Sequence, residues 1–289
     1  MRHMEQSPAP ISGPESHDPN DCAAVGASVG GGSRHSFKGR GSSWTGLPYR
    51  AAFWCWRRIL STIRDSLTRN TLARWTKETV RDTLAKGAGR DDVYSSEYYA
   101  YVDREAVRSA PVIVLSVIRD LRPTRVLDVG CGTGALLNEF KSQGVCGVGL
   151  EYSEAGLEMC RSRNLEVFPF DIESREEPQV GAVDIVTCFE VAEHLHEGHA
   201  DRLVHLLTKA GRVVVFTAAV PGQGGGADHV NEQPHEYWIE KFESAGFRFD
   251  ADISSRWRVE WSNSGAATFY SQNAMVFTRG IARSRNDRR

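Results

Sequence analysis

The sequence has few of the features that mark secreted or membrane-spanning proteins. Its six cysteines are scattered and form no C-x-x-C pair, a pattern typical of a reducing compartment rather than of a disulfide framework. No apolar run approaches the roughly 20 residues that a transmembrane helix needs. The N-terminus also lacks the basic-then-apolar order of a signal peptide. We therefore expect a cytoplasmic protein with no membrane span.

An excess of charge of one sign is also missing. The chain of 289 residues carries 35 basic and 37 acidic residues, a net charge of −2. A nucleic-acid-binding surface usually shows as a basic excess, so nothing in the overall charge indicates such a partner. The hydrophobic content of 40% is ordinary for a globular protein, and 289 residues are enough for one large domain or two small ones.

The two ends of the chain differ from its centre. Residues 1–50 are rich in Gly, Ser and Pro and are expected to form a disordered arm, because they bury too little apolar surface to offset their ordering entropy. Residues 51–115 begin with arginine-rich amphipathic segments and are expected to form a helical cap on the main domain. Docking of these N-terminal helices on a membrane surface or a partner is the alternative. Residues 280–289 are expected to form a basic tail.

Residues 116–279 alternate between strand-like and helix-like segments. The expected strands are RVLDVG, VCGVGLEY, LEVFPFDI, VDIVTCFEV, RVVVFTAA, FRFDADI and ATFYSQNAMVFTR. The expected helices are SSEYYAYVDREAVRSAPVIVLSVIRDL, interrupted at Pro111, and GALLNEFKSQG, SEAGLEMCRSRN, GHADRLVHLLTKAG and PHEYWIEKFESAGF. This alternation predicts an α/β fold with a doubly wound, mostly parallel seven-stranded sheet. The last two strands follow one another directly and predict an antiparallel edge strand.

Three glycines at alternate positions follow the first expected strand, in VLDVGCGTG. Ligands of open α/β sheets lie beyond the carboxyl ends of the strands, so Gly130, Gly132 and Gly134 are expected to let a ligand approach the backbone. A dinucleotide site would read G-x-G-x-x-G and would hold a pyrophosphate at a helix N-terminus. Asp128, two residues before the first glycine, would repel a pyrophosphate but suits a ligand with an ammonium group. The spacing therefore points away from a dinucleotide.

The segment VLDVGCGTG resembles motif I of the class I S-adenosylmethionine-dependent methyltransferases, and the resemblance continues in order to about residue 277. Glu151 stands where that family binds both ribose hydroxyls, and a carboxylate can accept both hydrogen bonds of a cis-diol. Asp171 stands where the adenine amino group is bound, with Ile172 beside the ring. The resemblance implies a Rossmann-like fold and S-adenosyl-L-methionine as cofactor. The cofactor-binding residues that it implies are Asp128, Gly130, Cys131, Gly132, Thr133, Gly134, Glu151, Tyr152, Asp171, Ile172 and Glu190.

A second group of polar residues follows the fourth and fifth expected strands. Glu190, Glu193 and His194 stand at i, i+3 and i+4, a spacing that places them together on a helical turn. His229 lies in the glycine-rich segment after the fifth strand, over the mouth of the expected site. A hydroxyl acceptor must lose its proton to a base or to a metal-activated group. We therefore expect His229, with Glu193 and His194, to act at the nucleophile.

These residues leave the role of metal open. Two carboxylates and two imidazoles could bind a divalent ion, and the small-RNA 3′-end methyltransferases look similar here, with E-V-x-E-H and a later histidine as metal ligands. In the alternative, which we adopt as the prediction, no metal is bound. Glu193 and His194 then anchor the loop, while His229 acts as base or positions the substrate.

Motifs of DNA-base methylation are missing. The residues after the fourth strand read CFEV instead of N-P-P-Y or D-P-P-Y, and Cys188 lacks the preceding proline of the C5-cytosine enzymes. Cys188 is expected to be a buried apolar residue. Aromatic residues in YSSEYYAYVDRE and Trp238 either line an acceptor pocket or belong to the core.

We therefore predict a methyltransferase that acts on a hydroxyl of a small metabolite or a sugar-bearing natural product, with a small-molecule acceptor and no DNA partner. The resemblance includes quinone-pathway O-methyltransferases. The alternatives are a metal-assisted methyltransferase of an RNA 3′ end and a non-catalytic, cofactor-binding regulator.

Overall fold

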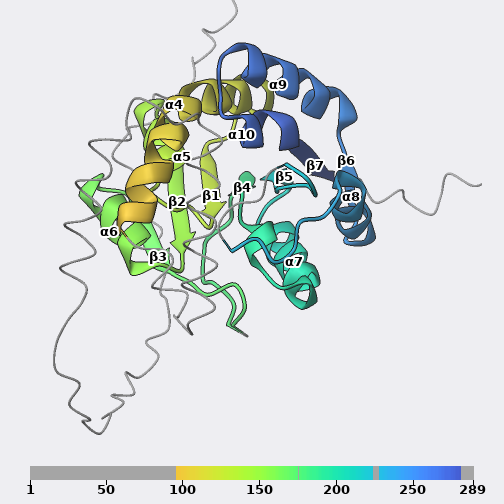
Figure 1. The fold of residues 1–289 in the computed structure, drawn as a ribbon, viewed down its shortest axis with the longest axis horizontal. Coiled ribbons are helices and arrows are strands. Elements are labelled where there is room, and N and C mark those ends of the chain that lie inside the picture. Colours follow the sequence, from red (N-terminus) through yellow and green to blue (C-terminus); the bar gives the residue numbers. More distant parts are fainter. Residues whose placement is uncertain (1–95, 175, 224–227, 281–289) are drawn as a thin grey trace, which may run out of the picture.

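The computed structural model describes residues 96–280, with gaps at 175 and 224–227 (Figure 1). The predicted arm (1–50), most of the predicted cap (51–115) and all but the first residue of the predicted tail (280–289) lie outside the described residues.

The core of the fold is one seven-stranded sheet in the order β3-β2-β1-β4-β5-β7-β6, which confirms the predicted doubly wound α/β architecture. The strands are β1 (Arg125–Val129), β2 (Cys146–Glu151), β3 (Glu166–Pro169), β4 (Ile185–Phe189), β5 (Val213–Thr217), β6 (Phe247–Phe249) and β7 (Met275–Arg279). The first five are parallel, and β7 is antiparallel to both β5 and β6. Strand order reverses between β1 and β4, the position where ligands of such sheets bind.

Helices cover both faces of this sheet (Figure 1). One face carries α4 (Ser96–Leu121), α5 (Ala135–Ser142), α6 (Glu154–Ser162), α9 (Ala251–Asn263) and α10 (Thr268–Asn273). The other face carries α7 (Ala200–Ala210) and α8 (His235–Ser244). Because side chains alternate along a strand, β1 sends Val126 into the first layer and Leu127 into the second. No helix of the described ranges is long and apolar enough to cross a bilayer.

Helix α4 runs through Pro111, so the predicted interruption at this residue is wrong. A proline within a helix removes one backbone hydrogen bond, to the carbonyl four residues earlier. Pro111 and Val107, the residue whose carbonyl loses that bond, both face solvent, where water can hydrate the carbonyl. The buried face of α4, with Ile113, Val114 and Val117, stays continuous. The helix also crosses the predicted boundary between residues 115 and 116.

Two helices separate the last two strands, where the sequence predicted two strands in direct succession. FRFDADI forms a strand only at Phe247–Phe249, and ATFYSQN forms α10 rather than the start of β7. A short apolar run cannot be assigned from periodicity alone, which explains this error. Trp257 and Trp261, four residues apart on α9, are fully buried, and Asp250 caps the helix by accepting a hydrogen bond from the Ile253 amide.

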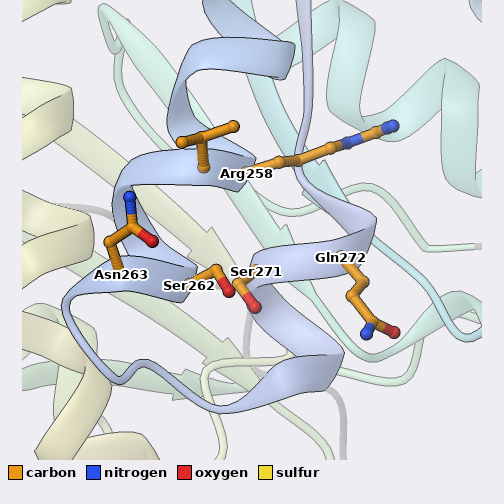
Figure 2. A pocket seen from close by; sticks show the side chains of 6 residues that line it. Arg258, Ser262, Asn263, Ser271 and Gln272 are labelled. Atoms are coloured by element: carbon orange, nitrogen blue, oxygen red, sulfur yellow. The ribbon is translucent and has the colours of Figure 1, made fainter.

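A surface groove of about 410 Å³ lies between α9 and α10 (Figure 2). It is lined by Arg258, Val259, Ser262, Asn263, Ser271 and Gln272. None of these residues belongs to the predicted site. We therefore assign the site from the strand ends at the reversal point of the sheet.

Candidate active site

The glycine loop follows β1 and turns directly into α5. Gly130, Gly132 and Gly134 all have positive φ angles, of 71°, 53° and 75°. The amides of Gly130 and Cys131 both donate to the Leu150 carbonyl at the end of β2. A Cβ on Gly130 would lie only 2.4 Å from Cγ2 of Val191, after β4. The loop therefore fills the space between the ends of β2 and β4 and brings its backbone to the edge of the sheet, as the sequence predicted.

Asp128 is buried at the carboxyl end of β1, beside Thr187 of β4. The Thr187 hydroxyl donates to Oδ1 of Asp128 at 2.6 Å. Burial, with a smaller effect of the Glu151 charge, raises the pKa of Asp128 to about 7. A cation near this carboxyl would favour its ionised form, which agrees with a ligand that carries an ammonium group.

The substitution Asp128→Asn tests this burial through the pH dependence of stability. Because the native pKa, about 7, lies above the ordinary value of 3.8, the unfolded chain loses this proton first as pH rises. Because ionisation is then easier in the unfolded chain than in the native state, the free energy of unfolding falls progressively between about pH 4 and pH 7. Asparagine cannot ionise, and its Oδ1 can still accept from Thr187. We expect urea unfolding to show a variant more stable than the parent by ~1 kcal/mol or more at pH 8, and less so at pH 5. Parallel pH curves for the two proteins would contradict the raised pKa.

Glu151 ends β2 and joins three segments through its carboxylate. Oε2 accepts from the Gly132 amide at 2.7 Å, while Oε1 accepts from the Ser153 amide at 2.9 Å and from the Tyr99 hydroxyl of α4 at 3.1 Å. Burial raises the pKa of Glu151 despite these donors. A carboxylate offers about four acceptor positions, and these three donors and the nearby Tyr152 amide account for them in this structure. Its position beside the glycine loop fits a ribose diol.

The remaining cofactor-binding candidates lie at the same sheet edge or in the core behind it. Asp171 follows β3, and its Oδ1 accepts from the Glu173 amide at 2.8 Å. Ile172 is packed in the core on the α7 side, and Cys131 and Thr133 are buried in the glycine loop. Tyr152 is exposed.

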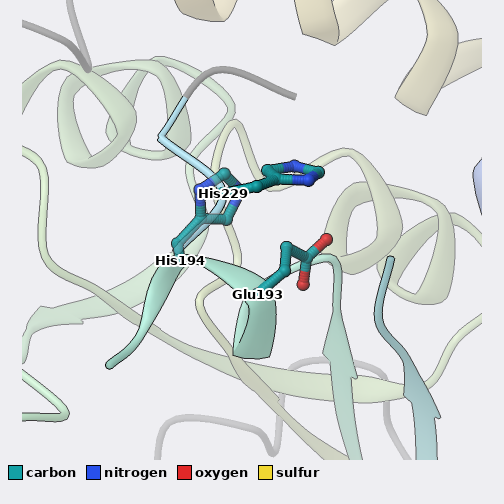
Figure 3. Close-up of side chains that lie close together, drawn as sticks. All are labelled: Glu193, His194 and His229. Carbon is teal, nitrogen blue, oxygen red and sulfur yellow. The ribbon is translucent and has the colours of Figure 1, made fainter. Parts of the chain in front are cut away.

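Glu193, His194 and His229 lie together at the ends of β4 and β5 (Figure 3). One ligand atom of each lies within 4.8 Å of those of the other two, a spacing that could hold a metal ion. The rings of His194 and His229 meet edge to face at 4.9 Å between centroids. This association joins segments about 35 residues apart in the chain, as the sequence predicted.

Backbone hydrogen bonds hold the two segments together. The amides of Val230 and Asn231 donate to the Glu193 carbonyl at 2.9 and 3.0 Å. Nδ1 of His194 lies 3.2 Å from the Asp228 carbonyl oxygen. The position of His229 over Glu193 is therefore built into the fold.

The predicted helical turn after β4 is shorter than expected. It is the 3-10 turn η2 (Ala192–His194), followed by η3 (Glu197–His199). Glu190 lies before the turn at a φ of 55°, with its amide bonded to Thr217, and is not one of the three clustered residues. The predicted α-helical turn is therefore absent, although the Glu190 carboxyl still lies beside that of Glu193.

Two buried carboxyls lie side by side here. Burial and their mutual repulsion raise the pKa of Glu190 well above its ordinary value, and burial raises that of Glu193. Glu193 is 0% exposed, and the groups nearest its carboxyl in the described part of the chain, the amides of Glu193 and Ala219 and the Glu190 carboxyl, form no well-aligned hydrogen bond with it. A buried carboxyl with incomplete hydrogen bonding is costly, so it marks a place where a proton donor or a cation can be bound.

The structure also places four residues around or behind the site, of which Glu232 and Asn273 were not indicated by the sequence. Glu232 lies 2.8 Å from His229, and the side chain of Asn273 accepts from Gln223 on the loop after β5. Asn273 belongs to a segment that the sequence assigned to a strand, so no pattern indicated it. Trp238 is fully buried against Phe216 and belongs to the core. Cys188 is buried, as predicted.

Comparison with known proteins agrees with this geometry. A family model described as a methyltransferase domain matches residues 99–258. The ubiquinone biosynthesis O-methyltransferase of Acinetobacter baylyi is 33% identical over 101 residues, which are 32% of this chain and 42% of that protein. The protein of the same name from Bordetella avium is 35% identical over 105 residues, which are 34% of this chain and 43% of that protein. The chain thus spans less than half the length of these relatives.

Among solved structures, Streptomyces venezuelae DesVI is similar over 62% of this chain and 95% of that chain, with 16% identity and a TM-score of 0.46. The match to the family model includes the glycine loop, Glu151 and the Glu193–His229 cluster, and it covers more than half of the 289 residues. The chain therefore belongs to the methyltransferase domain family.

Proposed function

We propose that the protein methylates a hydroxyl group of a small-molecule acceptor and that His229 is the general base. The observation that carries this proposal is the cluster of Glu193, His194 and His229 beside the glycine loop. Two relatives named as O-methyltransferases support a hydroxyl acceptor. The scattered cysteines support a cytoplasmic location, and the missing DNA-base motifs support an acceptor other than DNA.

The sheet edge would hold the cofactor in its predicted orientation. Glu151 would accept hydrogen bonds from the ribose hydroxyls, and Asp171 would accept one from the adenine amino group. The ionised carboxyl of Asp128 would favour the ammonium end. When bound, S-adenosyl-L-methionine supplies a methyl group on a sulfonium, which is already a good leaving group.

The residues after β4 and β5 would handle the proton of the acceptor. An imidazole nitrogen of His229 would take the hydroxyl proton as the oxygen attacks the methyl group. The buried Glu193 carboxylate lies against the imidazole and would stabilise the imidazolium that forms, because opposite charges attract strongly where water is excluded. His194 would anchor the loop through the Asp228 carbonyl.

Label transfer from methyl-tritiated S-adenosylmethionine into fractionated cell extract tests the proposal, with and without a chelator. We expect label in the small-molecule fraction and no loss of it with the chelator. Cofactor binding without label in any fraction would overturn the proposal in favour of a non-catalytic regulator.

A metal-assisted reaction is the second candidate, and the spacing of Glu193, His194 and His229 favours it. A divalent ion held by one carboxylate and two imidazoles could lower the pKa of an acceptor hydroxyl. The same experiment separates the candidates, because label in RNA that disappears with the chelator would indicate metal-assisted methylation of an RNA 3′ end.

The substitution Glu151→Gln tests the assignment of the ribose site. Glutamine keeps the size of the side chain but loses its charge and one strong acceptor, and a hydrogen bond to a charged group contributes ~1.5–3 kcal/mol. We expect S-adenosylhomocysteine to bind about tenfold or more weakly in a calorimetric titration. Glu154→Gln, at an exposed glutamate three residues later, is the matched control and should bind normally. Unchanged affinity in a folded Glu151→Gln variant would remove the ribose assignment.

A further inference from the structure

His229 has a carboxylate partner on its own loop. Its Nδ1 lies 2.8 Å from Oε1 of Glu232, and the two side chains are 13% and 22% exposed. A carboxylate can only accept a hydrogen bond, so the proton between these two atoms belongs to Nδ1 of the imidazole. In a neutral imidazole the other nitrogen, Nε2, then carries an unprotonated lone pair.

Backbone hydrogen bonds fix the segment that carries His229 and Glu232. The residues between the two side chains, Val230 and Asn231, both donate their amides to the Glu193 carbonyl. On the other side of His229, the Asp228 carbonyl is bound to His194. The backbone on both sides of His229 is therefore held in place, which limits the orientations of the imidazole. In this orientation the hydrogen bond to Glu232 selects the tautomer of the ring.

The two glutamates around His229 differ in their surroundings. Glu193 is fully buried next to the Glu190 carboxyl, whereas Glu232 is partly exposed and bonded to the imidazole. Of the two, only Glu232 forms a hydrogen bond with the imidazole. Carboxylates that fix the tautomer of a histidine recur wherever the second ring nitrogen takes a proton or binds an ion.

We propose that Glu232 is a positioning residue that accepts the Nδ1 hydrogen of His229 and presents its Nε2 lone pair to the acceptor hydroxyl. The inference rests on the proposed function of His229. During transfer, the acceptor O–H bond breaks as its proton moves to Nε2, the oxygen forms a bond to the methyl carbon, and the sulfonium leaves as a neutral thioether. Glu232 keeps accepting from Nδ1 and stabilises the resulting imidazolium.

The tautomer is measured directly in the resting protein by ¹⁵N NMR of labelled histidine, with His229→Ala used to assign the signals. We expect His229 to show a protonated Nδ1 and an unprotonated Nε2 at a pH where the imidazole is neutral, and Glu232→Ala to lose this preference. A His229 that is protonated on Nε2 in the parent protein would overturn the proposal. This readout needs no turnover, so it stands apart from the test of the proposed function.

Kinetics then test whether Glu232 acts through His229. Carboxylates that hold a functional histidine through its second ring nitrogen contribute about 10–100-fold, so Glu232→Ala should lower kcat to that extent with little change in KM. The double variant Glu232→Ala/His229→Ala should be no slower than His229→Ala alone. Glu240→Ala, which removes an exposed glutamate from α8, is the control for lost charge and should leave kcat unchanged. Additive losses in the double variant, or a loss in the control equal to that of Glu232→Ala, would overturn the proposal.

Discussion

Replacing His229 by alanine is expected to lower kcat by about 10²- to 10⁴-fold while cofactor binding is retained, because a positioned general base contributes about that much. The imidazole lies beside the buried Glu193 carboxylate, whereas the Glu151 carboxylate that we assign to the ribose is bonded to the Gly132 amide of the glycine loop. The change should therefore remove proton transfer and leave the cofactor site intact. Single-turnover methyl transfer and calorimetric titration with S-adenosylhomocysteine measure the two effects separately.

The control for this substitution is His205→Ala. His205 is an exposed histidine on α7, so its loss should change neither turnover nor binding. A fully active His229→Ala variant would remove this residue from the mechanism. A variant that binds the cofactor weakly and transfers methyl groups normally once saturated would instead move His229 into the cofactor site.

The second large effect is expected from Gly134→Ala, which should lower the free energy of unfolding by ~3 kcal/mol. Gly134 caps the N-terminus of α5 at a φ of 75°, a conformation that costs a residue with a side chain ~1–2 kcal/mol. An added Cβ would also lie 2.5 Å from Cδ1 of Leu165 and 2.8 Å from Sγ of Cys160. Relieving such overpacking typically costs a further ~1–3 kcal/mol. Urea unfolding followed by circular dichroism measures the loss.

Gly144→Ala is a matched control because it separates backbone strain from crowding. Gly144 ends the same helix region at a φ of 77°, but a Cβ there would meet no atom within 4 Å. Its substitution should lower the free energy of unfolding only by the cost of the left-handed backbone conformation, ~1–2 kcal/mol. Equal losses at the two glycines would show that Leu165 and Cys160 move away without cost and that the loop is less tightly packed than the distances indicate.

The parallel core of the fold could be predicted because its signals are local. In VLDVGCGTG an apolar strand ends in glycines that adopt positive φ angles, and the helix after the loop begins at Ala135. Asp128, Glu151 and Asp171 each follow or end a parallel strand, so the sequence alone placed them at one sheet edge. The predicted membership of the methyltransferase family is confirmed by the family model.

The region after β6 could not be predicted in the same way. ATFYSQN is short and partly apolar, and such a run is compatible with a strand or a helix. Its helix, α10, is selected by long-range packing: the ring of Tyr270 lies 5.8 Å from that of Phe189 at the end of β4, and the side chain of Ser109 on α4 accepts from the Ala267 amide. These contacts join segments more than 70 residues apart, so no local window contains them.

The sequence by itself determined the fold class, the glycine loop and the acidic residues at the strand ends, because strand periodicity and glycine chemistry act over a few residues. Only the tertiary structure decided which carboxylate forms a hydrogen bond with His229. The spacing in E-V-x-E-H predicted Glu190 beside Glu193, where it lies, but Glu190 is not among the residues grouped with His229. Glu232 instead lies within hydrogen-bonding distance of His229, in a loop without periodicity. The loop is held there because the amides of Val230 and Asn231, between these two residues, donate to the Glu193 carbonyl. Backbone hydrogen bonds between segments far apart in the chain bring these residues together, so a local sequence pattern cannot predict the contact.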